Sequence, residues 1–236
     1  MKARFLALAA LVLGLASCQT EPEGLNVNVG GEVDTTITVT IPDTESRAGG
    51  TNSAKGVFDN GVLGNENDNV TMRYIFQVYY NNQESLAEPQ VKYSDGKTVN
   101  FDIRLVPGRD YTFVVWADVV KKNDQGEWTD LHYNTLNDEG KINLRNIKVN
   151  SDSWAAMDES RDAFTVTELV EDYTGASIIN LELKRPFAKL RVVTTDMEWI
   201  NNINVVPAYA EVTYSSNTKL PKTFNAFTET IGTEIF

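Results

Sequence analysis

Short segments in which apolar and polar residues alternate recur along most of this chain, and they constrain its fold more than any other feature. Residues 36–41, TITVTI, place Ile37, Val39 and Ile41 on one face and threonines on the other, the period of a half-buried β-strand. Other segments predicted as strands are 70–80, 91–93, 98–105, 111–120, 128–133, 141–149, 164–169 and 177–183. Turn residues separate them, so the pattern predicts an all-β chain: a β-sandwich of about seven strands, or up to nine if every short segment is counted, with at most one short helix.

Four segments between and within these strands carry specific expectations. Residues 111–120 are apolar almost throughout, which is typical of a central strand covered on both faces. Residues 94–97, SDGK, predict a hairpin turn. Residues 151–161 are the one helix that the sequence predicts, because Ser151 or Asp152 can cap it. The Gly- and Asn-rich connection 43–69 is long for a compact domain unless it is functional or mobile.

The first eighteen residues predict export. Two basic residues precede an apolar run from Phe5 to Leu15, which is shorter than the roughly 20 residues of a membrane-spanning helix but fits a signal peptide. The ending Leu15-Ala16-Ser17-Cys18 resembles a bacterial lipobox, in which the cysteine is acylated and becomes the mature N-terminus. An ordinary signal peptide followed by a chance cysteine is the alternative. We expect Cys18 to carry lipid and to tether the protein to a membrane.

Composition limits how the fold can be stabilised and which binding partners the protein can have. Cys18 is the only cysteine, so disulfides cannot staple the fold, and stability must come from a core that 42% apolar residues are ample to build. The formal net charge of −12 argues against nucleic acid as a partner, since phosphate binding requires clustered Lys and Arg.

The predicted organisation is a signal peptide at 1–17, a lipidated flexible tether at 18–35, an N-terminal β-sandwich domain at 36–195, and a further β segment at 196–236. Two new strands are predicted in that last segment, at 203–207 and 210–214. A hairpin alone is only marginally stable. The segment therefore either pads the first sandwich or begins a second, incomplete domain, and we expect the second.

No residue pattern predicts catalysis. The single histidine, His132, excludes most triads and His-rich metal sites, and its simplest interpretation is a residue at a strand end. The spacing of the carboxylates does not single out an acid and a base, and they are most simply a solvated face. These are Asp152, Asp158, Glu159, Asp162, Glu168, Glu171 and Asp172. Residues 65–69, NENDN, offer oxygen ligands for calcium but lack the EF-hand spacing. We expect a protein that is not an enzyme and that needs no metal or cofactor.

Tryptophans offer a different chemistry, because an exposed aromatic ring can stack on a sugar. Trp116 lies in the apolar run 111–120 and is expected in the core. Trp128, Trp154 and Trp199 lie near loops or element ends, where aromatic side chains commonly keep one face wet. We take Trp128 and Trp154 as candidate glycan-stacking residues.

Several of these stretches together resemble the fimbrillin-like lipoproteins of Bacteroidales, which are type V pilus subunits and their anchor or tip relatives. The resembling features are the lipobox at Cys18, the strand TITVTIP at 36–42, Arg47-Ala48-Gly49, and LELKRPFAKLRVVTT at 181–195. The resemblance covers most of the chain, although its motifs are short. Most members of that family carry a full second β domain, of which only the start is expected here.

The resemblance implies a transthyretin-like sandwich, an outer-membrane lipid anchor and assembly by strand exchange. In that family a protease cuts after an arginine in the loop that follows the first strand, and a strand from a neighbouring subunit fills the groove that opens. Arg47 matches the cleavage position, although loop arginines are common. The implied partners are other fimbrial subunits by strand donation, with host or bacterial surface ligands as further candidates. The predicted function is a structural, anchoring or adhesive component of a fimbria, and the alternative is a glycan-binding surface lipoprotein of a nutrient-capture system.

Overall fold

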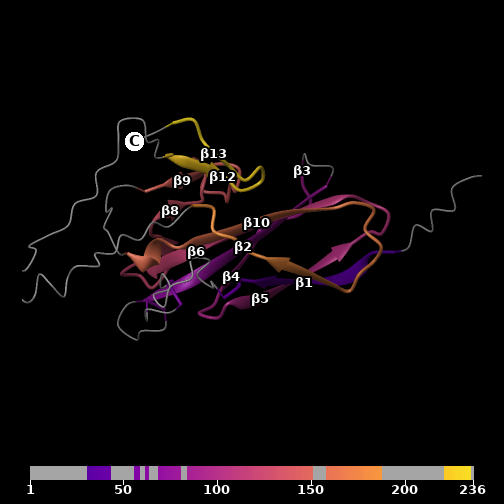
Figure 1. The fold of residues 1–236 in the computed structure, drawn as a ribbon, viewed down its shortest axis with the longest axis horizontal. Helices are drawn as coiled ribbons and strands as arrows, with labels where there is room; N and C mark the ends of the chain where they lie inside the picture. The colour runs from indigo at the N-terminus through magenta and orange to yellow at the C-terminus, as the bar shows by residue number, and fades with distance from the viewer. Residues whose placement is uncertain are drawn as a thin grey trace, which may run out of the picture.

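The computed structural model of this chain describes residues 31–43, 56–58, 62–63, 69–80, 84–150, 158–187 and 221–234. Apart from one 3₁₀ helix, η1 (Glu159–Arg161), the regular elements in this part of the chain are β-strands. They form three sheets stacked in layers (Figure 1). The prediction of an all-β sandwich is confirmed, and a third, smaller layer adds to it.

The first sheet has three strands in the order β11–β1–β5. β1 (Val33–Thr40) lies in the middle, antiparallel to β5 (Thr98–Leu105) and parallel to β11 (Ile178–Glu182). The alternation predicted for TITVTI is present, because Ile37 and Val39 are buried while the intervening threonines are half-buried.

The second sheet is built on two long antiparallel strands, β2 (Val70–Tyr80) and β6 (Tyr111–Lys122), which pair along the whole of β2. On the far side of β6 lies β10 (Ala163–Val170), with β7 (Trp128–Asp130) pairing the end of β6. On the far side of β2 lie β3 (Glu84–Ser85) and β4 (Gln90–Tyr93).

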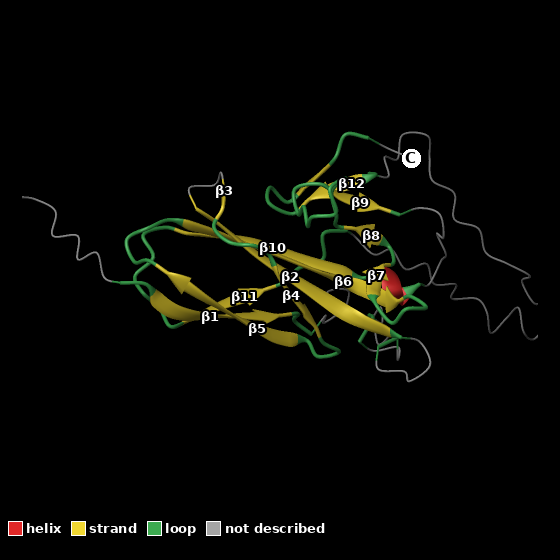
Figure 2. Ribbon diagram, turned by 180° about the vertical axis from the view of Figure 1, so that it is seen from behind, coloured by secondary structure: helices red, strands yellow, loops and turns green. Residues whose placement is uncertain are grey.

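The third sheet has four short strands in the order β13–β12–β9–β8. These are β13 (Thr230–Ile231), β12 (Thr223–Asn225), β9 (Ile147–Val149) and β8 (Tyr133–Asn134). Figures 1 and 2 show this sheet on the side of the β2–β6 layer opposite to β1 and β5. The long middle sheet is therefore covered on both faces.

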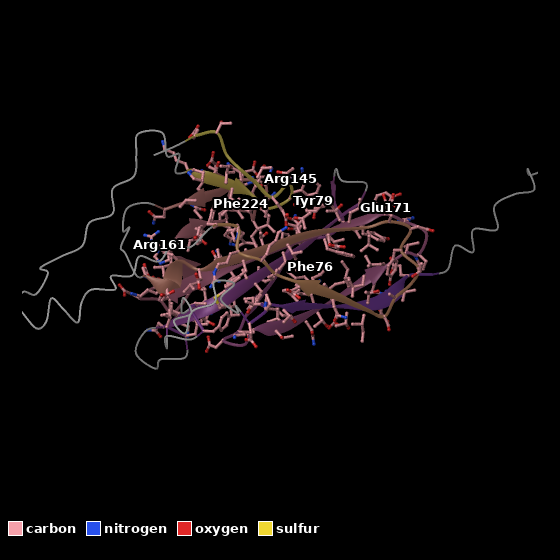
Figure 3. The ribbon with its side chains drawn as sticks, in the orientation of Figure 1. Phe76, Tyr79, Arg145, Arg161, Glu171 and Phe224 are labelled. Atoms are coloured by element: carbon pink, nitrogen blue, oxygen red, sulfur yellow. The ribbon has the colours of Figure 1, made fainter. Side chains whose placement is uncertain are left out.

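Two cores result, and alternate residues of the same strands fill them. The larger core lies against the first sheet and takes Phe76 of β2 and Phe113 of β6, which stack at 6.0 Å. The smaller core lies under the third sheet and takes Ile75 and Trp116. Figure 3 shows Phe76 below the layer and Tyr79 and Phe224 above it. Burial on both faces explains why β2 and β6 are apolar almost throughout.

The turn at residues 94–97 is present, but the predicted hairpin is not formed by backbone pairing. β4 pairs with β2, whereas β5 pairs with β1, so this turn carries the chain from one sheet to the other. Only side chains bridge the two strands: Gln90 Nε2 donates to the Asp102 carbonyl at 2.9 Å, and Lys92 Nζ donates to the Asn100 carbonyl.

Two other expectations are changed by local backbone bonding. Residues 141–149 were expected to form one strand, but only β9 at their end does so. The Asn143 side chain accepts the Arg145 N–H at 3.1 Å and makes a turn there. Of the predicted helix 151–161, residues 151–157 lie outside the described residues. The remainder forms η1, in which Asp158 caps the N-terminus by accepting from the Ser160 N–H.

The described part of the C-terminal segment, 221–234, packs against the sandwich. β12 pairs with β9, and Phe224 lies 5.7 Å from Trp116 between ring centroids. These contacts favour, for these residues, the alternative that the segment pads the first sandwich. Residues 188–220 lie outside the described residues, so the boundary at 195/196 stays a prediction.

Candidate functional site

β1 pairs with β5 over its whole length and with β11 over its C-terminal five residues. Eight of its residues pair with β5 and five pair with β11. Its inward side chains Ile37 and Val39, and Ile41 just after it, are buried in the larger core. Burying side chains of this size contributes about 1.5–3 kcal/mol each. β1 is thus an integral strand of the larger core.

Both ends of β1 carry additional ties. At the start, the Thr35 hydroxyl lies against the Tyr173 hydroxyl, and Tyr173 in turn donates to the Ala176 carbonyl at 2.7 Å. At the finish, the Ile41 N–H donates to the Lys97 carbonyl at 2.8 Å. The Lys97 ammonium then pairs with Asp43, and this contact lowers the pKa of the Asp43 carboxyl.

The chain returns to the core at Val57. Its backbone N–H donates to the buried Asp162 carboxylate at 3.0 Å, and Asp162 also pairs with Arg185 at 2.9 Å. The neighbouring Phe58 ring packs against Phe164, with centroids 6.4 Å apart. The connection between β1 and β2 is therefore anchored independently of β1, seventeen residues after Thr40, the last residue of β1.

Three of the four predicted site residues, Cys18, Arg47 and Trp154, lie outside the described residues. Lipidation and cleavage therefore stay predictions. The fourth, Trp128, lies on β7 and stacks on Tyr93 of β4, with ring centroids 5.4 Å apart and planes 24° apart. The Lys122 ammonium also lies over the Trp128 ring, 4.8 Å from its centroid. Tyr93 and Lys122 thus already contact much of the Trp128 indole face. The Tyr93 side chain, by contrast, is 45% exposed.

A buried ion-pair network lies beside this aromatic pair and was not predicted. Arg73, which pairs with Tyr93 across the β2–β4 ladder, donates from Nε and Nη2 to the two oxygens of Asp118 at 2.9 and 2.7 Å. Its Nη1 lies 2.6 Å from Asp130. Burial opposes the charge on Arg73, but Asp118 and Asp130 outweigh it and raise the pKa of the guanidinium. The sequence contains two signals of this ion pair. One is the single arginine in the otherwise uncharged run 70–80, and the other is the single aspartate in the run 111–120.

His132 contacts a serine, but with the polarity opposite to a catalytic pair. Its Nε2 lies 2.6 Å from the Ser160 Oγ, and the Ser160 hydroxyl donates its one proton to Asp158. His132 must therefore donate from Nε2, whereas a general base would accept the serine proton there. Its Nδ1 is buried without a hydrogen-bond partner among the described residues. Burial, with the nearby Arg161 charge, lowers the pKa of His132 to about 4.

Within the described ranges, His, Cys, Asp and Glu do not gather into groups of three or more that could hold a metal ion. The same part of the chain has no helix with the length and apolarity needed to cross a membrane. The NENDN stretch at 65–68 lies outside it, and Asn69, which ends the stretch, adopts a left-handed backbone with φ of 47°.

These observations define a layered all-β protein in which β1, the first strand of the described residues, lies in the middle of the sheet β11–β1–β5. Residues 26–234 match DUF6562, a family of unknown function, and the chain belongs to that family. No curated protein and no solved structure matches the chain.

Proposed function

We propose that this protein is a non-enzymatic, lipid-anchored component of a fimbria, structural, anchoring or adhesive, that assembles by strand exchange. The observation that carries the proposal is the position of β1 in the middle of its sheet. Loss of β1 would leave the facing edges of β5 and β11 unpaired and would open an apolar furrow where Ile37, Val39 and Ile41 now lie. A strand from a neighbouring subunit restores both the hydrogen bonds and the burial.

The anchor at Val57 supports the same proposal. Arg47 lies in the sequence between the end of β1 and this anchor. A cut after Arg47 would therefore separate β1 from the rest of the chain, while the Val57–Asp162 contact would keep the following segment in place. The Cys18 lipid tether would leave with β1. Retention of this unit yields a membrane-anchored form, and its loss yields a form ready to accept a strand.

An arginine-specific protease tests the proposal. The folded protein is incubated with the protease, and the new N-terminus is read by mass spectrometry. We expect a cut after Arg47, release of the fragment that contains β1, and SDS-resistant oligomers of the remainder. Arg47→Gln is the control and should stay intact and monomeric. Resistance of Arg47 in the folded protein, or a cleaved product that stays monomeric, would contradict strand exchange.

The lipid anchor has a separate test. Cells that express the protein are fed a labelled fatty acid, and the outer membrane is isolated. Label on the protein, and its presence in that fraction at the cell surface, is expected for the parent and not for Cys18→Ser. Absence of label on the parent protein would contradict the lipid anchor. It would not bear on strand exchange, which the protease experiment tests.

A glycan-binding surface lipoprotein is the second candidate, and the exposed Tyr93 ring favours it. Stacking of Tyr93 on Trp128 holds the ring in one orientation, which lowers the entropy lost on binding. Affinity electrophoresis in gels that contain polysaccharide would reveal retardation of the parent and not of Tyr93→Ala. Equal mobility with and without polysaccharide would set this candidate aside.

A further inference from the structure

The outer edge of β11 presents a row of backbone groups without partners among the described residues. The Thr36 N–H donates to the Ser177 carbonyl, and the Leu183 N–H donates to the Thr40 carbonyl. With the parallel register of β1 and β11, these bonds turn the backbone groups of Ile179 and Leu181 toward β1. The N–H and C=O groups of Ile178, Asn180 and Glu182 must then point away from it.

The outer edges of β5 and β10 are partly covered by contacts. The carbonyls on the outer edge of β5 accept from the Gln90 and Lys92 side chains. On the edge of β10, Thr165 exchanges backbone hydrogen bonds with Lys184, and the Thr167 N–H donates to Glu229 at 3.1 Å. On β11, by contrast, such contacts are absent among the described residues at Ile178, Asn180 and Glu182.

At its N-terminal end this edge lacks the usual protection. Natural edge strands are commonly blunted by charge, proline or a bulge. Here Ile178 is 60% exposed, the highest value for a large apolar side chain in the described residues. Leu169 on β10, the strand that approaches β11 at the Thr165–Lys184 bridge, is 47% exposed. Figure 2 shows β11 beside β1 in the lower layer.

Acidic residues predominate along this edge. Residues 163–172, which include β10, contain Glu168, Glu171 and Asp172 but no lysine or arginine. Residues 176–183, which include β11, contain Glu182 and no basic residue. Lys184, which follows β11 and bridges to β10, is already paired with Glu229. Glu171 lies just past the end of β10, at the end of the layer away from Arg161 (Figure 3). An occupant that carries lysine or arginine complements this edge, whereas a second copy of this acidic chain is repelled.

We propose that β11 binds an extended, lysine- or arginine-bearing segment of another polypeptide, which adds as a fourth strand to the sheet β11–β1–β5. The main chain of the segment pairs with Ile178, Asn180 and Glu182, and its basic side chains meet Glu168 and Glu182. The site is present while β1 is in its sheet, so this proposal does not depend on strand exchange. Each of the two proposals can be true without the other.

Hydrogen exchange on the full chain tests the proposal, with a ten-residue peptide of alternating lysine and valine as the probe. In the free protein the amides of Ile178, Asn180 and Glu182 should exchange rapidly, and those of Ile179 and Leu181 slowly. Saturating peptide should slow the first three by about tenfold or more, the factor expected when an open amide gains a hydrogen bond. The matched peptide with glutamate in place of lysine should leave them unchanged.

Asn180→Pro separates pairing at this edge from other binding. The Asn180 N–H points away from β1, so proline removes an outward donor and no bond to β1. Peptide affinity should fall by about tenfold in this variant, while Asn180→Ala, which keeps the N–H, should bind as the parent does. Slow exchange at Thr38 in both variants would show that β1 stays in place.

Four results would overturn the proposal. One is protection of the three amides in the free protein, which would show that the chain covers its own edge. The second is equally tight binding of the peptide to Asn180→Pro and to the parent. The third is equally tight binding of the glutamate peptide. The fourth is a dimer in light scattering that depends on Asn180, which would make a second copy the occupant.

Discussion

Arg73 and Asp118 face each other across the β2–β6 ladder and form a two-pronged ion pair that is almost sealed from solvent. Burial raises the pKa of Asp118, and the guanidinium opposes that shift. Arg73 stays charged at any pH at which proteins fold, and its charge is buried. The Asp118 carboxylate offsets the free-energy cost of burying that charge. The pair ties the two longest strands together.

Removing one member of the pair should therefore destabilise the fold strongly. Asp118→Ala leaves the buried guanidinium with Asp130 alone, and breaking a buried pair in this way costs about 3–5 kcal/mol. Urea unfolding followed by tryptophan fluorescence measures the change. Asp102→Ala, which removes an exposed carboxylate hydrogen-bonded to Thr36, is the control and should cost less than about 1 kcal/mol. Equal losses for the two variants would contradict the role assigned to the buried pair.

His132 predicts a pH dependence of stability. Its pKa is about 4 in the folded chain, against 6.5 when unperturbed, so the unfolded state binds a proton first as the pH falls. The free energy of unfolding should decrease between about pH 6.5 and pH 4, by up to about 3 kcal/mol from this group. Above pH 6.5 its contribution is constant.

His132→Gln isolates this contribution from that of the carboxylates. The difference in unfolding free energy between parent and variant should change across pH 6.5–4 and stay flat from pH 7 to pH 8. Thermal or urea unfolding at a series of pH values measures it. A difference that is flat throughout would show that His132 titrates normally in the folded chain.

The two faces of β1 should respond differently to truncation. Ile37 is fully buried in the larger core, and its replacement by alanine should cost about 2–5 kcal/mol. Thr38 points to the outer face of the sheet, where Thr38→Ala should cost less than about 1 kcal/mol. Urea unfolding of both variants provides the comparison. A small loss for Ile37→Ala would mean that β1 is a loosely held strand.

Glu229 combines a strained backbone with two side-chain contacts. Its φ of 53° is in the left-handed region, while its carboxylate accepts the Thr167 N–H and pairs with Lys184. Both Glu229→Ala and Glu229→Gly lose these contacts, but glycine adopts this backbone freely. Glu229→Gly should therefore be more stable than Glu229→Ala by about 1 kcal/mol in thermal unfolding. The reverse order would show that the left-handed backbone is not maintained in solution.

The positions of the main strands could be predicted from the sequence because they depend on local patterns. β5 begins and ends where its alternation does, and β2 coincides with the run 70–80. Strand partners depend on distant packing, which the patterns do not report. The turn after β4 has the residues of a hairpin, yet Tyr74 donates to the Gly96 carbonyl and Thr71 to Asp95, which hold the turn against β2.

The candidate sites divide in the same way. Trp128 stood out in the sequence by residue type, but its partner Tyr93 ends an unremarkable strand, and only the fold brings the two rings together. The open edge of β11 could not be predicted at all. It arises because β1 pairs in parallel with a strand that lies well over a hundred residues later in the chain, a choice of neighbour that local alternation leaves undetermined.

The two ladders of β1 also decide how this protein would respond to mechanical force. A pull applied through the residues before Val33, along the axis of the strand, loads the hydrogen bonds to β5 and β11 at the same time and in shear. Bonds loaded in that way must break together, whereas a strand peeled from an edge loses them one after another. Tension on the N-terminal segment is therefore resisted by both ladders of β1 at once. Extraction of β1 by pulling alone would be slow.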